Sequence, residues 1–183
     1  MASMSLMGLG FAPDGFSTVK NYNSKYTGNA KLGDLFMVKC GSSSAGSGPG
    51  YYHAGVYCSE EDEEIIHFTV SPSQSSSSGI AASSSFSSGP GFVSKVHMNM
   101  FCGQNHYAIY RKNGEIPTSF RANIRKAMKE IPEYDVLDSN CIHFAMKLLD
   151  VDLQTRENYI KQLLKITKGI SRSTNQEMRS LPI

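Results

Sequence analysis

Alternating apolar and polar positions predict a strand hairpin in the first half of the chain. The segments YYHAGVYC (residues 51–58) and EIIHFTV (residues 64–70) are rich in β-branched and aromatic residues and flank the acidic stretch SEEDE. This pattern is typical of two strands joined by a turn. Residues 31–40 predict an earlier turn and strand, and weaker strand signals run through residues 91–101 and 105–112.

The apolar period becomes helical after Pro117. One face of residues 118–131 carries apolar residues at helical spacing, and residues 141–149 and 153–168 predict two further helices. The last of these carries basic residues beside its apolar ones, namely Lys161, Lys165 and Lys168. Strands followed by helices predict an α+β domain in which an antiparallel sheet packs against helices.

Composition divides the chain into a domain and its flanks. Residues 1–30 show little periodicity and predict a flexible N-terminal arm, and the domain is expected over residues 31–152. Two low-complexity loops rich in Ser and Gly, residues 41–50 and 71–91, interrupt the domain. Residues 153–183 predict a basic amphipathic helix and then a disordered tail from Gly169.

Charge and cysteine content narrow the function classes. The net charge of +2 over 183 residues gives no reason to expect nucleic-acid binding. The chain shows no signal peptide and no Cys-x-x-Cys pair, so its four cysteines predict reduced thiols in a cytoplasmic protein. No apolar run reaches the length of about 20 residues that a transmembrane anchor needs. The cysteines and histidines lack metal-ligand spacing, so we expect neither a metal nor a cofactor.

Cys141 lies at the expected start of a helix, in the stretch DSNCIHFAMKLL. Cys141, Phe144, Ala145, Leu148 and Leu149 follow the spacing of a core-facing stripe, and Asp138 or Ser139 would cap the helix. Amide groups at a helix start favour a thiolate and can hold an oxyanion. The alternative is that Cys141 is a small buried apolar residue, because reactivity needs an activating base.

Two histidines on the predicted hairpin are the candidate base and its partner. Strand alternation places His53 on one face of residues 51–58 and His67 on one face of residues 64–70. A turn centred on Glu60 would put the two histidines opposite each other. One imidazole could then accept the Cys141 proton while the other orients it. Two unrelated strand histidines remain the plain alternative.

Four motifs in this order resemble the lecithin retinol acyltransferase family: GDLFMV, YYHAGVY, EIIHF and SNCIHFAMKLL. The closer resemblance is to its HRAS-like suppressor branch of phospholipid-metabolising enzymes. It extends from about Lys31 to Leu149 and implies a circularly permuted papain-like (NlpC-type) fold. It also implies Cys141 as nucleophile, His53 as general base and His67 as the residue that orients His53.

The chemistry implied is acyl transfer through a thioester, with a glycerophospholipid ester as acyl donor and water, an amine or a lysolipid as acceptor. Tyr51 and Asn140 are expected near the oxyanion or the pocket. The chain departs from the family pattern at Ile142, where glutamate is usual, and at Ala54, where tryptophan is usual. It also lacks the usual hydrophobic anchor, so peripheral membrane contact through the basic C-terminal helix is one expectation.

Two alternatives remain open. An NlpC-type amidase or peptidase would use the same nucleophile and base on an amide. A binding or regulatory module that kept the fold would need neither. The sequence does not decide between phospholipase A1 and A2 selectivity or between hydrolysis and transfer, and it leaves the role of the loop at residues 71–91 and the oligomeric state open.

Overall fold

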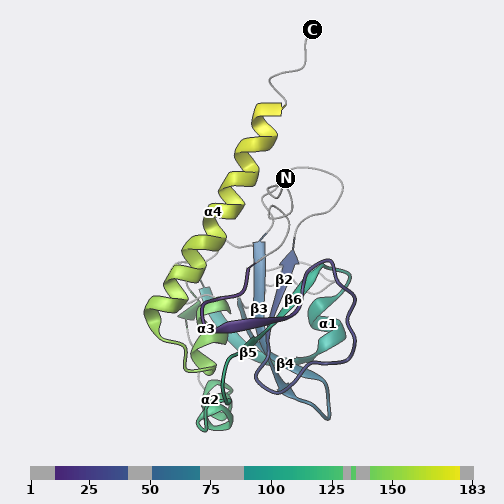
Figure 1. The fold of residues 1–183 in the computed structure, drawn as a ribbon. Coiled ribbons are helices and arrows are strands. Elements are labelled where there is room, and N and C mark those ends of the chain that lie inside the picture. The colour runs from purple at the N-terminus through teal and green to yellow at the C-terminus, as the bar shows by residue number, and fades with distance from the viewer. Residues whose placement is uncertain (1–10, 41–50, 71–88, 130–132, 135–140, 178–183) are drawn as a thin grey trace, which may run out of the picture.

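The computed structural model describes residues 11–40, 51–70, 89–129, 133–134 and 141–177. Within these ranges one antiparallel sheet has the strand order β1-β6-β2-β3-β4-β5-β7. Its strands are β1 (Phe16–Lys20), β2 (Leu35–Cys40), β3 (Tyr51–Ser59), β4 (Glu64–Val70), β5 (Gly89–His97), β6 (Tyr107–Lys112) and β7 (Glu133–Tyr134). The helices are α1 (Met98–Cys102), α2 (Phe120–Ala127), α3 (Cys141–Leu148) and α4 (Leu153–Glu177). The predicted α+β class is confirmed (Figure 1).

Helices cover both faces of the sheet. Residues of α2, α3 and α4 pack in one core cluster with Leu35 and Met37 of β2. Residues of α1 pack in a second cluster with Phe36 and Val38 of the same strand. Successive strand residues point to opposite faces, so a strand buried on both faces is apolar throughout. The run LFMV in β2 follows from this, and α1 lies apart from the other helices in Figure 1.

The β3–β4 hairpin forms as predicted, but in a different register. Gly55, rather than His53, is the partner of His67. The ladder shifts between Tyr57 and Ser59, and Glu63 in the turn has a positive φ of 49°. The turn is therefore centred on Glu61 and not on Glu60, which moves the pairing by two positions. A shift of two keeps every side chain on its predicted face.

The first strand corrects the prediction of a flexible arm over residues 1–30. Residues 16–20 form β1, which pairs antiparallel with β6 through Phe16↔Lys112 and Ser17↔Arg111. Phe16 and Tyr22 enter the core on the α3 face. The order of this segment depends on a partner strand about 90 positions further along the chain. Residues 1–10 lie outside the described ranges.

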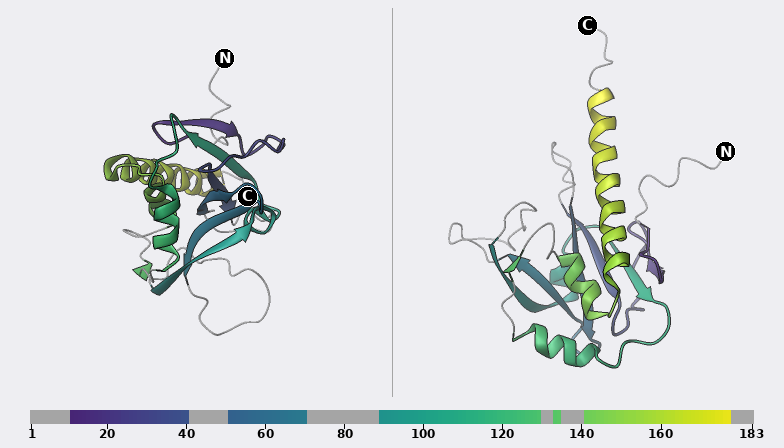
Figure 2. Two further views of the ribbon diagram at one scale, coloured as in Figure 1. Left: turned by 90° about the horizontal axis from the view of Figure 1, so that it is seen from below. Right: turned by 90° about the vertical axis from the view of Figure 1, so that its left-hand side faces the viewer.

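Three other boundaries differ from the sequence prediction. Residues 89–91, expected in a low-complexity loop, belong to β5, while residues 41–50 and 71–88 lie outside the described ranges. Residues 98–102, expected to continue a strand, form α1, whose first turn is capped by the His97 side chain. The last helix continues past Gly169 to Glu177, so the predicted tail begins too early. Figure 2 shows α4 extending beyond the sheet.

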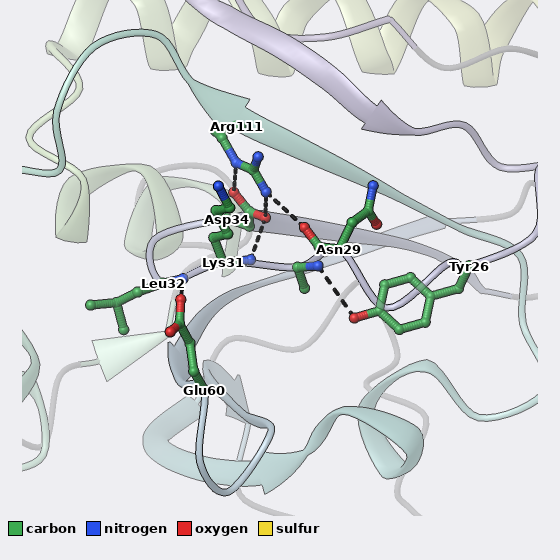
Figure 3. A network of polar contacts seen from close by, with 8 residues as sticks. Tyr26, Asn29, Lys31, Leu32, Asp34, Glu60 and Arg111 are labelled. Atoms are coloured by element: carbon green, nitrogen blue, oxygen red, sulfur yellow. Dashed lines mark hydrogen bonds and ion pairs between the residues drawn. The ribbon is translucent and has the colours of Figure 1, made fainter.

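An ion pair on the buried Asp34 carboxylate fixes the start of β2. Both Asp34 carboxylate oxygens accept from Arg111 of β6, from Nε and Nη2, each at 2.7 Å. The Lys31 backbone N–H donates to the same carboxylate at 2.8 Å, and Glu60 of the β3–β4 turn accepts from the Leu32 N–H at 3.0 Å. Figure 3 shows this network joining three parts of the chain. It holds β2 beside β3, the strand that carries His53.

Candidate active site

His53 and His67 form the centre of the site. His53 Nε2 lies 2.9 Å from His67 Nδ1, and the two rings are nearly perpendicular, at 86°. His67 is opposite Gly55, which has no side chain to fill the space across the ladder. Diagonal neighbours on adjacent strands are within reach of long side chains. The His53 side chain therefore extends across Gly55 to contact His67. The two histidines are close, as predicted, but in a different strand register.

Phe101 of α1 packs against both imidazoles. Its ring centroid lies 5.2 Å from that of His53 and 5.4 Å from that of His67. A Cβ atom added to Gly55 would come 2.9 Å from Phe101 Cζ and 2.4 Å from Ile65 Cγ2. The glycine therefore lets the phenyl ring approach β3 closely enough to cover the histidines.

Ser94 of β5 is a third polar residue in the site, and it contacts His67. The β4–β5 register pairs it with His67, and its Oγ lies 3.0 Å from His67 Nε2. Both ring nitrogens of His67 are thus engaged, one by His53 and the other by Ser94. The hydrogen-bonded chain His53–His67–Ser94 crosses three neighbouring strands.

Burial sets the charge state of the two histidines. It lowers the pKa of His53 to about 3, with repulsion from His67 as the second cause. Burial also lowers the pKa of His67 to about 4. Both imidazoles are therefore neutral near pH 7, so His53 has a nitrogen able to accept a proton.

Cys141 approaches β3 from the other face of the sheet. It is the first residue of α3, is 4% exposed, and packs in the core cluster with Ala54, Val56 and Ile66. Its Sγ lies 3.9 Å from the backbone oxygen of Tyr52, the residue directly before His53. The buried stripe predicted for this helix is present, and it faces β3 and β4.

Strands β3 and β4 separate, forming a fork, near His53, His67 and Cys141. In the described residues the β3–β4 pairing ends at Gly55↔His67, whereas β3 stays paired with β2 as far as Tyr51. Tyr57 bonds through both its N–H and its C=O to the segment that leads into β2. Backbone groups alternate in direction along a strand, so the Tyr52 carbonyl points toward β4. The Cys141 sulfur therefore lies at this fork, next to the start of the histidine chain.

The other site predictions lie partly outside the described residues. Asn140, Asp138 and Ser139 fall in the range 135–140. The backbone of Tyr51 is in β3, but its side chain is not described. The geometry therefore brings together His53 and His67. It places the Cys141 sulfur against the Tyr52 backbone, which directly precedes His53, and it leaves Tyr51 and Asn140 as predictions.

Sequence reasoning missed Ser94 and Phe101. A serine and a phenylalanine in weak strand signals carry no mark of function, and the strand that holds Ser94 follows a long low-complexity segment. Only the β4–β5 register identifies Ser94. The separation of β3 and β4 was also missed, because alternation describes each strand and not where a pair of strands diverges.

The described part of the chain contains neither a membrane-spanning helix nor a candidate metal cluster. None of its helices combines the length and apolar character needed to cross a membrane. It contains no cluster of three or more His, Cys, Asp or Glu side chains arranged to hold a metal ion.

A family model matches more than half of the chain. The model of the family described as lecithin retinol acyltransferase matches residues 29–152. That range includes β2 through α3, and with them the histidine chain and Cys141. A comparison with curated proteins gives no significant match.

Proposed function

Because the chain belongs to the lecithin retinol acyltransferase family, we propose that it is a cysteine-dependent phospholipid acyltransferase or acyl hydrolase. Family membership indicates thiol-dependent acyl-transfer chemistry on lipids at the level of the family. The glycerophospholipid ester and the HRAS-like suppressor branch are finer parts of the proposal. They rest on the motifs YYHAGVY, EIIHF and SNCIHFAMKLL.

The first half-reaction acylates Cys141. His53 Nδ1 takes the thiol proton, so the S–H bond breaks as the sulfur attacks the ester carbonyl carbon. The tetrahedral oxyanion is held by amide N–H groups at the start of α3, with Asn140 and Tyr51 as further donors. The intermediate collapses to a thioester, and the leaving lysophospholipid alkoxide takes the proton back from His53.

The second half-reaction removes the acyl group. Water, an amine or a lysolipid gives its proton to His53 and attacks the thioester carbonyl. The C–S bond breaks, and the leaving Cys141 thiolate takes the proton back from His53. Water releases a fatty acid, and the other acceptors receive the acyl chain. Cysteine and histidine supply both the nucleophile and the acid–base chemistry, so each proton that leaves a reactant returns to a product.

One observation carries the proposal. The Cys141 sulfur lies 3.9 Å from the carbonyl oxygen next to His53, and His53 Nε2 is engaged by His67 at 2.9 Å. With Nε2 engaged, Nδ1 is the nitrogen left to serve as base. The Cys141 thiol donates to the Tyr52 carbonyl and burial keeps His53 neutral, which supports a resting state without an ion pair, in which the proton moves during attack.

We also propose that the protein is cytoplasmic and contacts membranes peripherally. None of the four cysteines forms a disulfide, which suits a reducing, cytoplasmic setting. The N-terminal part of α4 carries exposed Leu164 between Lys161 and Lys165. An apolar residue beside basic ones suits peripheral contact with an anionic membrane surface, where the lipid substrate is found.

The test is product analysis with short-chain phosphatidylcholine, with and without an amine acceptor. The wild type should release fatty acid or transfer it, Cys141→Ala should do neither, and Cys58→Ala should retain activity. Cys58 is the matched control because it is a buried thiol at the far end of β3. Turnover of a peptide amide with no ester turnover would instead establish an amidase or peptidase. No turnover of either substrate would favour a binding module.

A further inference from the structure

We propose that Ser94 is a positioning residue that fixes the tautomer of the histidine pair so that His53 presents a bare Nδ1 to Cys141. This inference rests on the proposed function for the role of Cys141. The family model and the sequence motifs do not assign a role to Ser94, and the proposal follows from its place on β5.

The geometry gives each ring nitrogen of His67 one partner. Nδ1 faces His53 Nε2 at 2.9 Å, and Nε2 faces Ser94 Oγ at 3.0 Å. Ser94 and His67 are direct cross-strand partners, so the short contact follows from the β4–β5 register. Phe101 packs against both imidazoles and restricts their rotation. His67 therefore cannot turn without losing a hydrogen bond.

Two tautomers of the pair are compatible with these contacts. In the first, Ser94 Oγ accepts from His67 Nε2–H, so His67 Nδ1 is bare and accepts from His53 Nε2–H. His53 Nδ1 is then bare and acts as the base. In the second, Ser94 donates, His67 Nδ1–H donates to His53 Nε2, and His53 Nδ1 carries the hydrogen. Only the first tautomer can take the Cys141 proton.

Ser94 makes the first tautomer possible because its Oγ is the acceptor that the hydrogen on His67 Nε2 requires. In a buried site, an N–H group without an acceptor is costly. Placing the hydrogen on His67 Nε2 satisfies that N–H through Ser94 and leaves His53 ready to accept. Without the Ser94 oxygen, the hydrogen on His67 would favour Nδ1, which lies against His53. The proton balance is unchanged, since only the Cys141 proton moves and it moves to His53 Nδ1.

The test compares Ser94→Ala with Ser94→Thr in the full-length chain. Imidazole nitrogen NMR of labelled protein near pH 7 reports which nitrogen of each histidine carries hydrogen. The wild type and Ser94→Thr should show His67 protonated at Nε2, and Ser94→Ala should lose that preference. Thermal unfolding of each variant establishes that it folds, and Ser59→Ala is the matched control, since Ser59 ends β3 and bonds to Asp62 instead.

The kinetic readout is the rate of Cys141 acylation. Ser94→Ala should lower it about 10- to 100-fold with little change in KM, as expected when a base is present in the wrong tautomer. Ser94→Thr should restore most of it. Unchanged tautomers and an unchanged rate in Ser94→Ala would overturn the inference. If the wild type forms no acyl-enzyme, the proposed function fails, and the NMR comparison still decides whether Ser94 controls the tautomer.

Discussion

His53 Nε2 lies 2.9 Å from His67 Nδ1 although the two residues are not partners in the β3–β4 ladder. Gly55 occupies the position opposite His67, and the space above it is shared by His53 and Phe101. The histidine pair therefore depends on a residue that takes no part in the chemistry.

Gly55→Ala should disturb this arrangement. The new methyl group would lie 2.4 Å from Ile65 Cγ2 and 2.9 Å from Phe101 Cζ, so at least one of these side chains must move. We expect a loss of about 1–3 kcal/mol in the free energy of unfolding, the usual cost of overpacking a core. Urea unfolding measures this. A variant as stable as the wild type, with the same acylation rate, would show that the close packing is not required.

The activity should persist at mildly acidic pH. Burial lowers the pKa of His53 to about 3 and that of His67 to about 4, so both stay neutral well below pH 6. We expect kcat/KM to stay level from pH 8 to about pH 5, measured in short assays on protein shown to be folded. An acid limb centred near pH 6.5, the ordinary histidine value, would contradict this.

The same histidines should make folding pH-dependent. In the unfolded chain they bind protons near pH 6.5, whereas in the folded chain they bind them only near pH 3 to 4. Their contribution to stability is therefore complete above about pH 6.5 and is lost as the pH falls toward 4. A His53→Gln, His67→Gln double variant should lose stability less steeply over this window in urea titrations. Equal slopes would contradict the assignment.

Arg111→Met should destabilise the chain strongly. Asp34 is buried, with 1% of its side chain exposed, and Arg111 is its bidentate partner. Removing the guanidinium leaves a buried carboxylate without its charge partner, at an expected cost of about 3–5 kcal/mol. Lys95→Ala is the control, because the Lys95–Glu64 pair is longer, at 4.0 Å, and more exposed. Its loss should cost below about 1 kcal/mol, so similar losses in both variants would argue against a special role for Asp34.

Tyr159→Phe should not lower stability. The Tyr159 hydroxyl is buried in the core and has no hydrogen-bond partner among the residues that the structure describes. Removing such a hydroxyl is expected to leave the free energy of unfolding unchanged or to raise it by up to about 1–3 kcal/mol. Tyr26→Phe is the comparison, since the Tyr26 hydroxyl accepts from the Ala30 N–H at 3.3 Å. A loss above about 1 kcal/mol in Tyr159→Phe would mean that the hydroxyl is satisfied by a bound molecule.

Local pattern was enough to predict the central part of the fold. Two-residue alternation identified β3 and β4, and it placed His53 and His67 on one face even though the register was off by two. Helical spacing identified the buried stripe that begins at Cys141. These features depend on neighbours in the sequence, so the sequence contains them.

Features that depend on distant partners were not predicted. The strand that contains Phe16 forms because β6 pairs with it, and the role of Ser94 depends on the register of β5 with β4. The motif GDLFMV contains Asp34, but nothing in the sequence pattern indicates Arg111, its partner 77 positions away. In each case the structural role of a single residue is defined only by the partner that the folded sheet brings to it.

The most direct measurement for the proposed function is the intact mass of the protein after incubation with short-chain phosphatidylcholine vesicles. We predict an added acyl group on the wild type that hydroxylamine removes and that maps to the peptide containing Cys141. Cys141→Ala should carry no such group, whereas Cys58→Ala should carry it. No adduct on the wild type, or the same adduct on Cys141→Ala, would contradict a thioester at Cys141.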